Sequence, residues 1–115
     1  MALALFGAAS LGIVAAHADD VTFDVRLEHG RAPSNMRLIR VRQGDVVKLR
    51  WRSDRPIVLH LHGYDIETKV EPGAVAEMVF TARATGRFSI EPHTPKGGGG
   101  RDHEAVVVRI EVYPR

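Results

Sequence analysis

Short runs in which apolar and polar side chains alternate cover most of this sequence, and they constrain its fold more than any other feature. In the clearest run, apolar and basic side chains take turns: Val47, Lys48, Leu49, Arg50, Trp51 and Arg52. Successive side chains of a β-strand point to opposite faces of a sheet, so this run predicts a strand with one buried and one solvated face.

Similar runs recur along the chain, separated by turn-forming residues at intervals of about eight to twelve residues. The strands expected from them are residues 21–28, 37–41, 46–51, 57–62, 74–80, 87–91 and 105–113. No run has the period of a helix. The pattern therefore predicts an all-β fold, an antiparallel β-sandwich or barrel of seven to eight strands. Its core is expected to include the following side chains: Val47, Leu49, Trp51, Met78, Phe80, Val106 and Val108.

The first eighteen residues differ from the rest, because they contain no Asp, Glu, Lys or Arg. They end in Ala16-His17-Ala18, which has the small-x-small pattern of a signal-peptide cleavage site. We expect residues 1–18 to be a signal peptide and residues 19–115 to be a single mature domain, periplasmic or secreted. A short buried helix is the alternative, since no basic residue follows Met1. The apolar run is too short and too rich in Ala and Gly for a membrane span, so none is expected after signal removal.

Composition excludes several classes of function. The 115 residues contain no cysteine, which rules out disulfides, thiolate catalysis and thiolate metal ligands within them. The formal net charge is only +2 and charges of both signs are interleaved, so no nucleic-acid partner is expected.

The histidines are the candidate metal ligands. His60 and His62 lie two apart on a predicted strand, so both side chains point to one face with Cα atoms about 7 Å apart. His93 and His103 flank a loop that contains four consecutive glycines. Neutral imidazole is a good ligand for copper and zinc, so these four residues predict a metal site. The alternative is that they are surface or hydrogen-bonded histidines, as we expect for His29 in its turn.

Several segments, taken in order, resemble the cupredoxin family. They are VRQGDVV at 41–47, VLH at 58–60, PG at 72–73 and GRFSIE at 86–91. The VLH segment at 58–60 is similar to the strand that carries the family's first histidine ligand, above all in the copper domain of cytochrome oxidase subunit II. The resemblance extends from about residue 21 to residue 112 and implies a Greek-key cupredoxin-like sandwich, with His60 and His103 as the family's two histidine ligands.

The sequence also departs from that family. Where blue copper proteins have a cysteine after the Gly-x-aromatic strand, this chain has Pro92-His93, so neither a blue nor a purple copper site can form. Residues 60–63 read HLHG and resemble the HxHG motif of multicopper oxidases, although the rest of that copper cluster has no counterpart here. An enzymatic role therefore ranks lowest.

These observations predict a periplasmic copper-binding protein with a thiolate-free, mononuclear histidine site. His60 and His103 are the first candidates as ligands, then His93, with His62 a fourth ligand or a supporting group. We expect type-2-like Cu(II), with zinc as an alternative ion. We expect the chain to be a monomer. Its expected role is to hold copper or to deliver it to a periplasmic copper-handling or redox protein. The rival hypothesis is a metal-free cupredoxin-like interaction module.

The export prediction has a direct test. The mature protein should begin near Asp19, because cleavage is expected after Ala18. Mass spectrometry of the periplasmic or secreted fraction measures this, and an intact Met1 in the cytosolic fraction would contradict it.

Overall fold

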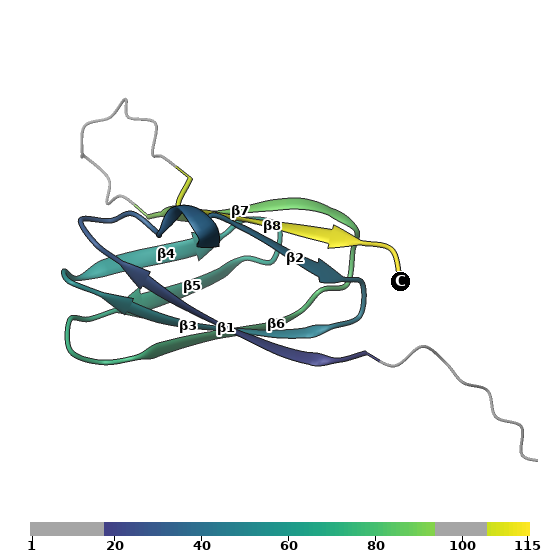
Figure 1. Cartoon of the computed structure of the whole chain (residues 1–115), viewed down its shortest axis with the longest axis horizontal. Coiled ribbons are helices and arrows are strands. Elements are labelled where there is room, and N and C mark those ends of the chain that lie inside the picture. The colour runs from purple at the N-terminus through teal and green to yellow at the C-terminus, as the bar shows by residue number, and fades with distance from the viewer. Residues whose placement is uncertain (1–17, 94–105) are drawn as a thin grey trace, which may run out of the picture.

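A computed structural model describes residues 18–93 and 106–115 (Figure 1). Within those ranges the chain forms eight strands and one short 3-10 helix, η1. The elements are β1 (Asp20–Leu27), η1 (Ser34–Met36), β2 (Leu38–Arg42), β3 (Val46–Ser53), β4 (Ile57–Leu61), β5 (Ile66–Val70), β6 (Ala76–Thr81), β7 (Gly86–Pro92) and β8 (Val108–Tyr113). The predicted signal peptide, apart from Ala18, and His103 lie outside the described residues. No helix in the described ranges is long and apolar enough to cross a membrane.

The strands form two sheets that pack face to face (Figure 1). One sheet has the order β1-β3-β6 and the other β2-β8-β7-β4-β5. The predicted all-β sandwich of seven to eight strands is thereby confirmed. The sheets are mixed, however, since β1 pairs with β3 and β2 pairs with β8 in parallel, while the other four pairs are antiparallel.

The parallel pairs arise because the turn after β2 does not close a hairpin. It carries the chain from one sheet to the other, where Gly44 N–H donates to the Ala82 carbonyl and Val46 N–H to the Asp19 carbonyl. Gly44 has a φ of 95°, which glycine adopts at little cost.

One strand, β5, has no counterpart among the expected runs. Its apolar face consists of Ile66, Thr68 and Val70, and only Val70 is fully buried. The threonine weakens the apolar alternation, so the segment reads as part of a long connection. In the structure it pairs antiparallel with β4 and forms the edge of the larger sheet.

The core is close to the one that the alternation predicts. Six of the seven expected side chains are at most 5% exposed: Val47, Leu49, Trp51, Met78, Phe80 and Val108. The prediction was wrong for Val106, which precedes β8 and is only partly buried. Val107 takes the buried position there, and its N–H donates to the Ile90 carbonyl.

The Asp45 carboxylate joins three separate parts of the chain. It accepts hydrogen bonds from the N–H groups of Arg42 at 2.9 Å and Asp19 at 3.2 Å, and it pairs with the guanidinium of Arg115. Burial alone would raise the pKa of Asp45, but these donors outweigh it and lower the pKa below its ordinary value. The ionised carboxylate therefore stabilises the end of the sandwich where the turn after β2, the start of β1 and residue 115 meet.

Trp51 should carry a large share of the core's stability. Its side chain is fully buried, so Trp51→Ala should lower the free energy of unfolding by roughly 3–5 kcal/mol. The indole Nε1 has no hydrogen-bond partner within the described chain, so Trp51→Phe should cost much less. Urea unfolding measures both, and a loss under about 1 kcal/mol for Trp51→Ala would show that Trp51 is not central to the core.

The lowered pKa of Asp45 predicts a pH dependence of stability. A group whose pKa is lower in the folded state stabilises the fold above its unfolded pKa, and that contribution disappears as the pH falls through the folded value. Asp45→Asn should therefore be less stable than the parent protein at neutral pH, and the difference should shrink as the pH falls below about 4, the ordinary value of an unfolded Asp. Urea unfolding at several pH values measures it. A difference that is constant with pH would contradict this role, since all other carboxylates are common to both proteins.

Candidate metal site

The candidate ligands lie on the outer face of the five-stranded sheet. Leu59 and Leu61 of β4 are fully buried, so His60, between them, points outward. His60 is opposite Glu67 of β5 on one side and Glu91 of β7 on the other. Paired residues of neighbouring strands share a face, so a carboxylate, an imidazole and a second carboxylate form a row across three strands.

His60 is the central member of a histidine cluster made up of His60, His62 and His93. Its ring centroid is 4.4 Å from that of His62 and 6.5 Å from that of His93. His62 directly follows β4, and its backbone N–H donates to the Ser89 carbonyl. His93 directly follows β7, and its backbone N–H donates to the Val58 carbonyl. The strand register therefore places His62 and His93 on opposite sides of His60 along the β4 direction. Three of the four predicted ligands gather, and His103 cannot be placed because it lies outside the described residues.

Each imidazole of the cluster has a carboxylate beside it. The pairs are His60 Nε2 with Asp65 Oδ1 at 3.6 Å, His62 Nε2 with Glu91 Oε1 at 3.3 Å, and His93 Nδ1 with Glu67 Oε2 at 3.4 Å. The side chain of His60 is 24% exposed, compared with 48% for His62 and 52% for His93. The cluster is thus open to solvent, and its most protected member is the one within a strand.

A tight turn after β4 brings the pieces together. Gly63 has a φ of 94°, and a Cβ there would lie 2.7 Å from the Phe88 ring, which packs beneath the turn. A residue with a side chain cannot occupy this position without displacing that ring. The glycine of the HLHG segment therefore has a packing role, and the turn it permits returns Asp65 towards His60.

The donor set is chemically suitable for a borderline divalent ion. Imidazole suits copper and zinc, carboxylate adds charge, and a chain without cysteine offers no thiolate. In the two described ranges, however, no group of three or more His, Asp or Glu side chains is already arranged to hold an ion. The structure therefore shows a cluster of suitable donors and not a preformed coordination shell.

His29 is engaged elsewhere. Its backbone N–H donates to the Asp54 carboxylate at 3.1 Å, and its ring Nδ1 lies 3.0 Å from a guanidinium nitrogen of Arg55. With a φ of 57° it occupies the left-handed region in the turn after β1. Its contacts are those of a turn residue.

The alternation alone did not single out Glu67. That residue belongs to β5, the strand that the sequence pattern missed, and lies directly opposite His60. If residues 66–70 had been recognised as a strand paired antiparallel with residues 57–61, Glu67 would have been placed opposite His60. Asp65 and Glu91, by contrast, stand out in the sequence as carboxylates near the histidines.

No protein-family model matches this sequence, and no curated protein matches it. Solved structures do match its fold. A chain of a heme-copper terminal oxidase dimer aligns with a TM-score of 0.61 and 20% identity, over 79% of this chain and 63% of the other. This chain thus spans less than two thirds of that relative.

Two further matches are nearer in length. A copper binding protein, solved in its apo form by NMR, aligns with a TM-score of 0.61 and 12% identity over 79% of this chain and 85% of the other. The periplasmic domain of subunit II of cytochrome oxidase (CoxB) of Bradyrhizobium japonicum aligns with a TM-score of 0.59 and 15% identity over 81% and 83%. At these identities the likeness concerns the fold. Together with the eight-stranded sandwich, it shows that this chain has the cupredoxin fold.

Proposed function

We propose that this chain is an exported copper-binding protein that holds Cu(II) on its histidine cluster without a thiolate and stores or delivers the ion. The observation that carries the proposal is the convergence of His62 and His93 on His60, on one face of a cupredoxin-like sheet. The copper binding protein among the structures of similar fold supports it.

The chemistry of the donors favours Cu(II) over Cu(I). Imidazole nitrogens and carboxylate oxygens suit Cu(II), which when bound would supply a Lewis-acidic centre of tetragonal geometry, whereas Cu(I) prefers thiolate and thioether. The chain's part is to present neutral imidazoles. Asp65, Glu67 and Glu91 can accept an N–H from these rings and so orient the opposite ring nitrogens. His103 remains a proposed ligand, and zinc is the alternative ion.

The placement of the rings suits storage or delivery. Only His60 is fixed within a strand, while His62 and His93 each directly follow one and are about half exposed. An open site with ligands at strand ends permits exchange of the ion. A periplasmic copper-handling or redox protein is the expected recipient, with the chain itself acting as a monomer and not as an enzyme.

A metal-free interaction module is the second candidate. It is favoured by one observation, that each imidazole already has a carboxylate partner at 3.3–3.6 Å. In this hypothesis the histidines and carboxylates form a polar network on the sheet surface.

Copper titration separates the two candidates. The mature protein should bind about one equivalent of Cu(II) with a type-2 electron paramagnetic resonance spectrum. His60→Ala and His103→Ala should each abolish tight binding, and His93→Ala should weaken it. A large loss in His62→Ala would identify a ligand, and a modest loss a supporting group. Binding should weaken on acidification, because protons compete for the imidazole nitrogens.

His29→Asn is the matched control. It removes an imidazole away from the cluster, and asparagine tolerates the positive φ of that position. It should bind Cu(II) as the parent does. If the parent binds no more tightly than His60→Ala, with both folded by circular dichroism, the copper proposal fails and the metal-free module is the better account.

A further inference from the structure

The other half of the same sheet face is rich in arginine. The register of β2, β8 and β7 aligns Arg40 and Arg87 with Glu111, and Leu38 and Ser89 with Arg109. Since paired residues share a face, these side chains all point outward. We call this surface the arginine face, and its cations are Arg40, Arg42, Arg87 and Arg109.

Several of these guanidiniums are held in place. Glu111 is 7% exposed, and its carboxylate receives Arg40 Nε at 3.1 Å, Arg87 Nε at 2.9 Å and the Tyr113 hydroxyl at 3.0 Å. The hydrogen bond from Arg40 contributes most to lowering the pKa of Glu111, so this carboxylate remains ionised. Arg40 and Arg87 nevertheless remain 59% and 71% exposed, so they can contact a partner without first being ordered.

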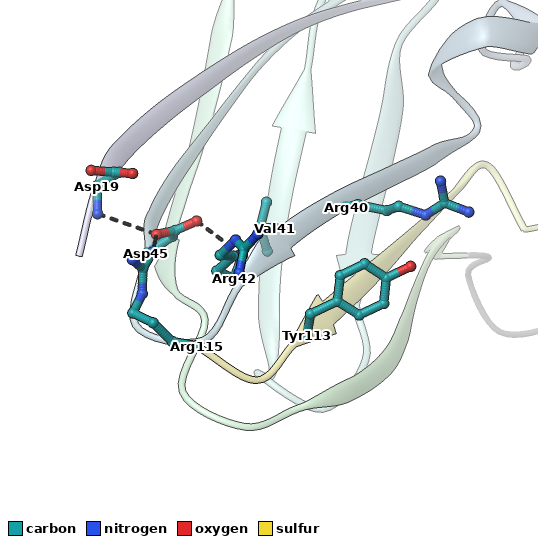
Figure 2. A pocket seen from close by; sticks show the side chains of 7 residues that line it. All are labelled: Asp19, Arg40, Val41, Arg42, Asp45, Tyr113 and Arg115. Atoms are coloured by element: carbon teal, nitrogen blue, oxygen red, sulfur yellow. Dashed lines mark hydrogen bonds and ion pairs between the residues drawn. The ribbon is translucent and has the colours of Figure 1, made fainter. Parts of the chain in front are cut away.

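A hollow of about 360 Å³ lies at the β2 edge of this face. Figure 2 shows the residues around it. Its lining residues are Asp19, Arg40, Val41, Arg42, Asp45, Tyr113 and Arg115. The carboxylate of Asp45 is occupied by its hydrogen bonds and by Arg115. The hollow is therefore bordered by guanidiniums, by one aromatic ring and by the Asp19 carboxylate.

Exposed apolar side chains also belong to this surface. In the described chain only three large hydrophobic side chains are at least 41% exposed, and two of them lie here, Leu38 at 41% and Tyr113 at 43%. All four cations are arginine and none is lysine. Arginine and tyrosine are enriched at protein interfaces and lysine is depleted, so this composition indicates a protein-binding surface.

We propose that the arginine face docks a partner protein that presents a cluster of carboxylates around an apolar or aromatic side chain. Charge complementarity selects the carboxylates, which guanidiniums bind through paired hydrogen bonds. Leu38 and Tyr113 provide the apolar contact.

Docking at this position would bring the partner close to the histidine cluster. Arg87 and Glu91 lie on the same face of β7, about 13 Å apart at the strand rise per residue. Glu91 contacts His62. Transfer of copper to the docked protein rests on the proposed function, whereas docking itself does not. Docking is therefore tested with metal-free protein.

The probe is a synthetic peptide of Asp and Glu with a central Tyr-Leu pair, labelled for fluorescence anisotropy, with an all-acidic peptide for comparison. The parent protein should prefer the Tyr-Leu peptide, and its amide NMR shifts should change on β2, β7 and β8. Arg42→Glu with Arg109→Glu should weaken binding about five- to ten-fold at low salt. Within the described residues, the side chains of Arg42 and Arg109 make no hydrogen bond or ion pair, unlike those of Arg40, Arg87 and Arg115.

The matched control is Lys48→Glu with Arg52→Glu, which makes the same change in net charge on the outer face of the other sheet. It should leave affinity within about two-fold of the parent. Equal weakening by both double variants would overturn the proposal, because binding would then follow net charge alone. Equal affinity for the two peptides would also overturn it. So would binding confined to phosphatidylglycerol vesicles or to inorganic phosphate, which would identify a lipid or a small-anion site instead.

Discussion

The buried carboxylate of Asp45 is the interaction on which the arrangement of the two sheets most depends. The turn that contains it is where the chain passes from the larger sheet to the smaller one, and the same carboxylate receives the N–H of Asp19 and the guanidinium of Arg115. The backbone carbonyl of Asp45 also accepts the N–H of Ala82, just after β6. A buried ion that three chain segments share is costly to leave unpaired, so those segments are held in one arrangement, and the backbone carbonyl adds the segment after β6.

Strand register then divides the outer face of the larger sheet into two chemically different surfaces. On β4 and β5 it sets imidazoles opposite carboxylates, and on β2 and β8 it sets guanidiniums around Glu111. The strand between them, β7, contributes Glu91 to the first surface and Arg87 to the second. The inner side of the same strands is apolar except for Thr68. The outer face of the larger sheet therefore carries the chemically distinctive side chains, because packing in the core does not restrict which residue types occur there.

The sequence was informative where burial forces a pattern. Alternation identified the strand around Trp51 and nearly all of its core partners, because only apolar side chains fit there. It missed β5, an edge strand whose packed face includes Thr68, and it did not reveal the parallel pairs, since pairing direction depends on where the chain crosses between sheets. It placed His60 and His62 on one face, but the approach of His93 required the register between β4 and β7.

The parallel pairing of β2 with β8 has a consequence for the order in which this protein folds. It joins residues 71 positions apart, and β2 is an edge of its sheet, with β8 as its only neighbour. The hairpin-like pair of β4 with β5 can form early, but β2 has no partner until the last strand is available. Chains dominated by such distant pairings fold slowly, on the order of milliseconds to seconds, because closing long loops costs entropy before the contacts form. We therefore expect the arginine face and the sheet edge beside it to assemble late, whereas β4, which bears the central histidine, can pair with β5 across a short loop.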